Sequence, residues 1–83
     1  MSIVYSENEA ILSDDIRVQE VDSLSEWLLA NPNASINLRQ CRHLHLAAVQ
    51  ALICAARHVS EWPEDPDLDY WVRPVLVRQE DEP

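Results

Sequence analysis

Residues 36–59, INLRQCRHLHLAAVQALICAARHV, constrain the fold more than any other stretch, because a strand pattern changes into a helix pattern inside it. Ile36 and Leu38 alternate with polar residues, as in a half-buried strand. A helix is expected to start near 45–47 and to end near His58, and its buried face comprises Val49, Leu52, Ile53 and Ala56. The stretch therefore predicts a strand that leads through a short bridge into a helix.

Strands and a helix are also expected before this stretch. Residues 3–5 form a β-prone cluster, and 10–12 and 16–18 are expected to form two short strands. The segment VDSLSEWLLANPN predicts a helix, with Asp22 or Ser23 as its N-cap and Glu26 completing a capping box. Pro32 disfavours a helical residue before it, so the helix is expected to end there.

The C-terminal third begins with an acidic, proline-containing segment, SEWPEDPDLDY, which is typical of a loop. Asp65 is expected to cap a following helix and Pro66 to occupy its first position. That helix is indicated by apolar residues at helical spacing: Leu68, Trp71, Val72, Val75 and Leu76. Pro74 predicts a kink or stop, and a strand within 74–78 is the alternative. Residues 77–83 are expected to be a flexible tail.

These elements predict a single domain over residues 1–83 in the α/β class. We expect a small mixed sheet of about four strands, two main helices and a short C-terminal helix. The helix between two successive strands implies a right-handed parallel crossover.

The charge of the chain limits its partners. Six basic residues against fifteen acidic ones give a net charge of -9. Nucleic acid and anionic membrane surfaces are therefore unfavourable partners, whereas a basic protein surface is complementary. The alternative is that the acids serve solubility alone.

No apolar run reaches the length of a membrane span, no secretory signal is evident, and two cysteines do not form a disulfide framework. A cytoplasmic location is expected.

Cysteine and histidine residues raise the question of metal binding or catalysis. Five lie close together in the sequence: Cys41, His43, His45, Cys54 and His58. Cys41, His43 and His45 alternate along an extended stretch, so their side chains are expected to point the same way. No spacing closes a tetrahedral zinc site, so no metal or other cofactor is expected, and a metal-binding module remains an alternative function. A chain without glycine is poorly suited to forming an oxyanion hole, so no enzymatic activity is expected.

The same central stretch resembles the STAS domains, the family of the bacterial anti-anti-sigma factors. The strand INL matches the family's central strand, and VDSLSEWLLAN resembles its first helix. Where the family has an Asp followed by a phosphorylated Ser or Thr, this chain has His45 and Leu46. Ala47, Ala48 and Val49 fall on the small residue, the Gly and the apolar residue that follow. The resemblance covers about residues 10–59 and implies a protein-binding surface at the start of the second helix.

The departures from the family pattern exclude its usual switch. Leu46 has no hydroxyl to phosphorylate, and His45 is a poorer N-cap than Asp, because its ring must be neutral and correctly oriented. The resemblance implies an adaptor or antagonist that binds an anti-sigma factor, a kinase-like protein or a transporter ATPase. Residues 43–50 form the expected contact, and the predicted partner-binding residues are His43, His45, Leu46, Ala47, Val49, Gln50 and Trp62. A homodimer through the same apolar corner is an alternative.

Three aromatic side chains lie in the C-terminal third. Trp62, in the acidic loop, is expected to be exposed and available to a partner. Trp71 is expected to fill the core of a domain that has no Phe.

Overall fold

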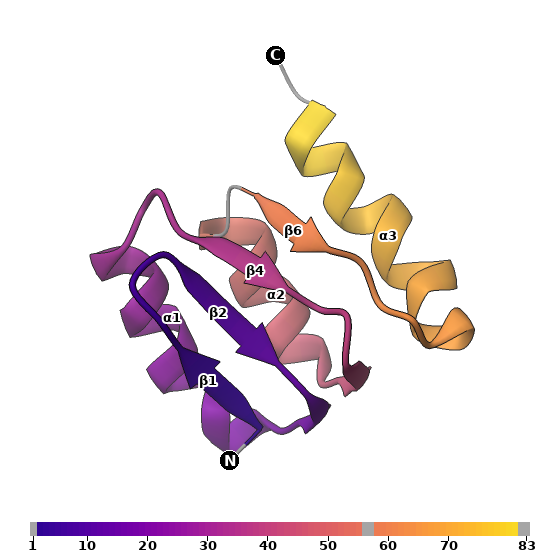
Figure 1. The fold of residues 1–83 in the computed structure, drawn as a ribbon, viewed down its shortest axis with the longest axis horizontal. Helices are drawn as coiled ribbons and strands as arrows, with labels where there is room; N and C mark the ends of the chain where they lie inside the picture. The colour runs from indigo at the N-terminus through magenta and orange to yellow at the C-terminus, as the bar shows by residue number, and fades with distance from the viewer. Residues whose placement is uncertain (1, 56–57, 82–83) are drawn as a thin grey trace.

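The computed structural model describes residues 2–55 and 58–81 of the chain. Strands and helices follow one another in a mixed α/β order (Figure 1): β1 (Ile3–Tyr5), β2 (Glu9–Leu12), β3 (Asp14–Ile16), the 3-10 helix η1 (Val18–Glu20), α1 (Val21–Ala30), β4 (Ser35–Asn37), β5 (Cys41–Leu44), α2 (Leu46–Ala55), β6 (Val59–Glu61) and α3 (Pro66–Asp81). The α/β class and the small mixed sheet of four strands are confirmed.

The main sheet has the strand order β1-β2-β4-β6. β1 and β2 are antiparallel, whereas β2 with β4 and β4 with β6 are parallel. α1 lies in the connection between β2 and β4, and α2 in the connection between β4 and β6 (Figure 1). The expected parallel strand pair around the first helix is therefore present.

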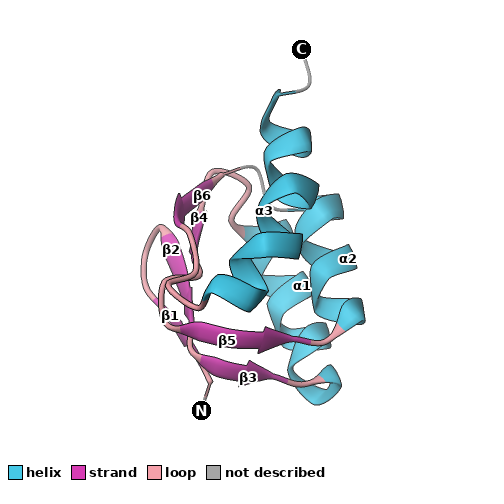
Figure 2. Ribbon diagram, turned by 90° about the vertical axis from the view of Figure 1, so that its right-hand side faces the viewer, coloured by secondary structure: helices cyan, strands magenta, loops and turns pink. Residues whose placement is uncertain are grey.

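A second, two-stranded sheet lies beside the main one. β3 pairs with β5 in parallel, and the register shifts between Asp14 and Asp15, so that Asp15 lies opposite His43 rather than Arg42. Figure 2 shows these two strands running from the main sheet toward the helices. The sequence predicts a strand at 16–18, but β3 ends at Ile16, and Val18 begins η1.

The core lies between the main sheet and the helices, which all cover the same face of it (Figure 2). β2 directs Ala10 and Leu12 into this core, and α1 contributes Leu24 and Leu28. Each fully buried Leu stabilises the fold by about 1.5–3 kcal/mol relative to an exposed one. Within the described residues, no helix is long and apolar enough to cross a membrane.

The start of α1 differs from the prediction. η1 runs directly into the helix, so the N-cap is Glu20, which forms no side-chain capping bond. Asp22 and Ser23 are already inside the helix. One turn earlier, at the start of η1, the Arg17 N–H donates to Glu20 Oε1 over 3.1 Å. The predicted end of the helix is confirmed, since α1 stops at Ala30, two residues before Pro32.

α3 starts where the sequence predicts, but it continues further than predicted. Asp65 Oδ1 accepts hydrogen bonds from the N–H groups of Asp67 and Leu68, over 3.0 and 3.1 Å, and Pro66 is the first helical residue. The helix continues through Pro74 to Asp81, so the predicted stop and the alternative strand are wrong, and residues 77–81 of the predicted tail are helical. Pro74 is exposed, while the buried Val72 and Leu76 hold the helix against the core on both sides of it.

Other predictions for the C-terminal half need correction. The first two residues of the predicted acidic loop belong to β6, in which only Val59 is buried. Trp71, expected in the core, is 40% exposed, because Val72 takes the inward position on α3. In α2, Val49 and Leu52 are buried and Ile53 is half-buried, while Ala56 lies outside the described residues.

Candidate functional site

The corner between β5 and α2 is held by backbone hydrogen bonds. The His45 N–H donates to the Ile16 carbonyl over 3.0 Å, which fixes the corner against the end of β3. The His45 carbonyl accepts from Ala48 and Val49 and so starts the first turn of α2. The corner therefore belongs to both the two-stranded sheet and the second helix.

His45 also caps α2 with its side chain. The Ala47 N–H donates to His45 Nδ1 over 3.0 Å, so this ring nitrogen is the acceptor. The ring has the orientation that the sequence argument required of a histidine cap. α2 has no acidic residue in its first turn, so no carboxylate there compensates the partial positive charge of the helix start.

Leu46 is the exposed apolar residue of this corner. Its side chain is 65% exposed although it is the first residue of α2. η1 packs against α2 and carries Val18, another exposed aliphatic residue. An exposed leucine at a helix start that is fixed by backbone bonds is a rigid apolar contact for another molecule.

The structure brings together four of the seven predicted partner-binding residues. His43, His45, Leu46 and Gln50 are exposed in or next to the corner, and we call these four residues the corner surface. Ala47 is half-buried beside them.

The other two residues do not belong to this surface. Val49 is 3% exposed, because it lies on the side of α2 that packs into the core, so its predicted contact with a partner is wrong. Trp62 is half-buried against the core in the loop after β6. The Arg73 guanidinium covers its ring, with Cζ 5.0 Å from the ring centroid. The expectation that Trp62 is freely exposed is therefore also wrong.

Cys41 and His43 do not share a face, contrary to the prediction. Cys41 is 1% exposed, whereas His43 is exposed. The register shift between β3 and β5 breaks the simple alternation that the prediction assumed. Among the residues that the structure describes, no group of three His, Cys, Asp or Glu side chains is placed to hold a metal ion.

The environment of Cys41 keeps its thiol protonated. Burial, together with the carboxylates of Asp15, Asp14 and Asp65, raises the pKa of Cys41 to about 12, although a hydrogen bond to the His43 backbone opposes this shift. Sγ lies 3.6 Å from the carbonyl oxygens of both Asp14 and His43. A thiol that stays protonated at neutral pH is a poor nucleophile, so the geometry does not activate Cys41 for catalysis.

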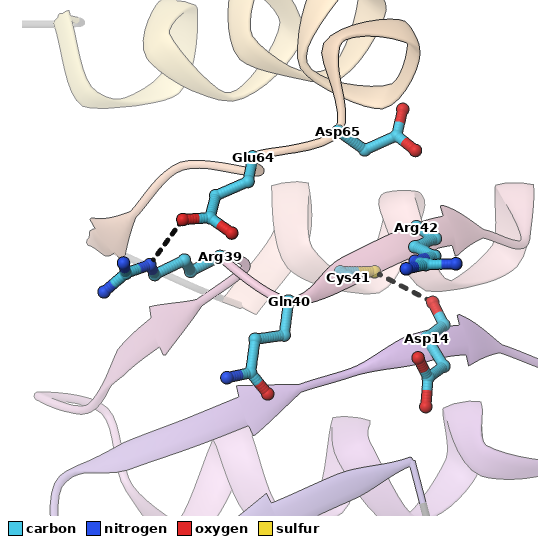
Figure 3. Close-up of a pocket in the computed structure, with 7 residues that line it drawn as sticks. All are labelled: Asp14, Arg39, Gln40, Cys41, Arg42, Glu64 and Asp65. Atoms are coloured by element: carbon cyan, nitrogen blue, oxygen red, sulfur yellow. Dashed lines mark hydrogen bonds and ion pairs between the residues drawn. The ribbon is translucent and has the colours of Figure 1, made fainter.

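A polar recess of about 440 Å³ lies above Cys41, next to the carboxyl ends of β2 and β4 (Figure 3). Its lining residues come from two separate loops, from the start of β3 and from β5: Asp14, Arg39, Gln40, Cys41, Arg42, Glu64 and Asp65. Arg39 Nε donates to Glu64 Oε2 over 2.9 Å across one side of the recess. Both partners are well exposed, so this pair contributes little to stability. Sequence reasoning missed the recess because its residues are distant in the chain and form no motif.

No family model, no curated protein and no solved structure matches the chain. A functional assignment therefore rests on the geometry described above.

Proposed function

We propose that this protein is a STAS-like, non-enzymatic protein-interaction module of the cytoplasm, which binds another protein through the corner surface. One observation carries the proposal: Leu46 is 65% exposed at the start of α2, at the position where the resemblance has a phosphorylated residue. A partner that covers this side chain removes its apolar surface from water, which favours binding.

The arrangement of secondary structure supports the same reading. A parallel crossover around α1 leads into β4, and β5 then follows β4 and leads into the helix that carries Leu46. Covering one leucine contributes about 1.5–3 kcal/mol, so Leu46 needs its neighbours for stable binding. His43, His45 and Gln50 supply polar groups around it, which suits the rim of an interface.

The proposed partner has a basic surface. The net charge of -9 favours association with a positively charged protein and accelerates encounter with it. An anti-sigma-like kinase and a transporter ATPase are the two branches of this proposal. In either branch the binding is constitutive, because Leu46 carries no hydroxyl.

The test is affinity capture from extract of the source cells with three forms of the chain: wild type, Leu46→Asp and Leu29→Asp. Leu29 is a matched control because it is a leucine of similar exposure, 76%, on α1. A partner identified by mass spectrometry should be retained by wild type and Leu29→Asp and lost with Leu46→Asp. Equal retention of every captured protein by all three forms would exclude the corner surface as the binding site.

A further inference from the structure

α3 has two apolar faces, and the fold uses one of them. Its inner face packs Leu68, Val72 and Leu76 into the core. Its outer face carries Tyr70, Trp71, Pro74 and Val75, at the spacing i, i+1, i+4 and i+5 that places residues on one side of a helix. We call these four residues the aromatic face.

The aromatic face is open to solvent. Tyr70 is 85% exposed, Trp71 is 40% exposed and Val75 is 36% exposed, and Pro74 between them is also exposed. Trp and Tyr are the residue types that most often dominate binding at protein interfaces. The inner face already docks the helix, so packing within the chain does not explain the outer one.

Acidic residues adjoin the aromatic face. Asp67 lies one helical turn before Tyr70 and Trp71 on the same side of α3, and it is exposed. Residues 60–83, which include α3 and the loop before it, contain eight acidic residues and two basic ones. Of the two basic residues, Arg73 pairs with Asp69, to which its Nε donates over 2.9 Å. The segment that carries the aromatic face is therefore negatively charged.

We propose that the aromatic face is a second docking surface, and that it binds a basic amphipathic segment of another protein. Apolar side chains of that segment would cover Tyr70, Trp71 and Val75, while Lys or Arg residues beside them would pair with Asp67. A second copy of this chain is the poorer occupant, because two chains of net charge -9 repel each other. This surface lies on α3 and does not depend on the proposed function of the corner surface.

The rigidity of the surface favours this role. Asp65 fixes the first turn of α3 through two hydrogen bonds, and Pro74 has no rotatable side chain to order. Binding at this surface therefore loses little conformational entropy on the side of this protein.

The experiment uses fluorescence anisotropy with labelled synthetic helical peptides added to the whole chain. One peptide carries Leu at helical spacing with Lys elsewhere, the second replaces Lys by Glu, and the third keeps Lys but replaces Leu by Ser. We expect the Lys/Leu peptide alone to bind strongly. Trp71→Ser and Asp67→Lys should each weaken this binding at least about 10-fold.

Three further forms separate a local effect from unfolding or unspecific attraction. Tyr70→Ser removes a side chain with little packing, so its folding should be unchanged and its binding weakened. Leu29→Ser and Leu46→Ser remove exposed leucines elsewhere and should bind as wild type does, which keeps this test independent of the corner surface. Equal binding by Tyr70→Ser, Trp71→Ser and wild type would overturn the proposal. So would self-association across a dilution series that Trp71→Ser abolishes, because the occupant would then be a second copy.

Discussion

α2 and α3 begin in opposite ways. α2 starts with an imidazole cap, in which one N–H donates to His45 Nδ1, and has no acid in its first turn. α3 starts with a carboxylate cap, in which Asp65 Oδ1 accepts from two N–H groups, and carries Asp67 and Asp69 in its first turn. α2 exposes a single leucine at its start, whereas α3 exposes an aromatic face along its outer side.

This difference separates the chemistry of the two proposed surfaces. A helix start carries a partial positive charge, which the acids of α3 compensate and which the imidazole of α2 leaves in place. The corner surface therefore presents an apolar residue without an acid in the first helical turn, and only the net charge of the chain attracts a basic partner to it, while the aromatic face combines apolar residues with an adjacent acid. One small chain can thus present two contacts that different partner surfaces would recognise.

The largest effects should come from the inner faces of the two helices. Leu52→Ala in α2 and Leu68→Ala in α3 should each lower the free energy of unfolding by about 2–5 kcal/mol, because both leucines are buried in the core. Leu46→Ala and Tyr70→Ala should change it by less than about 0.5 kcal/mol. Urea unfolding followed by far-UV circular dichroism measures all four. A large loss for Leu46→Ala would show that the start of α2 is part of the core.

The next effect concerns the middle of α3. Pro74→Ala should raise the free energy of unfolding by about 1–3 kcal/mol, because it restores an N–H donor to the helix interior and removes the clash of the ring with the preceding turn. Thermal unfolding is a suitable measurement, with Pro32→Ala outside the helices as the control. A loss of stability in Pro74→Ala would mean that the proline supports the helix.

Exchanging the caps tests the comparison directly. Asp65→Ala should cost about 1 kcal/mol, since two N–H groups lose their acceptor. His45→Asp should stabilise the chain by about 0.5–1 kcal/mol, since a carboxylate suits a helix start better than an imidazole. The same urea titrations measure both, and Gln50→Ala serves as a surface control. Opposite signs for the two changes are expected, and equal signs would contradict the account of the two helix starts.

The smallest effect comes from the thiol beneath the loop that leads to α3. Because the pKa of Cys41 is raised from 9.0 to about 12, its contribution to stability is complete below pH 9 and is lost as the pH rises toward 12. The loss should be about 0.8 kcal/mol at pH 9.5. Unfolding between pH 8 and 9.5 should show a steeper decline for wild type than for Cys41→Ala.

Cys54 provides the control for this measurement. It is exposed on α2, so Cys54→Ala should follow the pH profile of wild type, and a thiol reagent should label Cys54 first. Labelling of Cys41 in the folded chain at the same rate would contradict its burial.

Capping residues and prolines predicted the helix ends next to them correctly. Asp65 and Pro66 predicted the start of α3 correctly, because a capping carboxylate and a first-turn proline act within a few residues. Pro32 likewise predicted the end of α1. The alternation in ASINL predicted a buried strand, and the parallel pairing around α1 followed from element order.

Features that depend on contacts between segments distant in the sequence could not be predicted in this way. β6 is three residues long with one buried residue, so it has no detectable alternation without its partner β4. The register shift that separates Cys41 from His43 arises from pairing with β3. For α3, helical spacing alone did not indicate which of the neighbours Trp71 and Val72 faces inward. Helical spacing placed Val49 correctly on the buried face of α2, and only its partner contact, which the resemblance implied, was wrong.

The backbone conformation of Asp14 limits which residues can replace it. Its φ of 56° is the only positive value among the described residues, and the chain contains no glycine. At this residue the chain leaves β2 in the main sheet and enters β3 in the smaller one, where the Asp14 N–H donates to the Gln40 carbonyl. Gly, Asn and Asp adopt this backbone conformation readily, whereas β-branched residues do not. The joint between the two sheets therefore tolerates few replacements, although it lies at the surface where substitution is usually unrestricted.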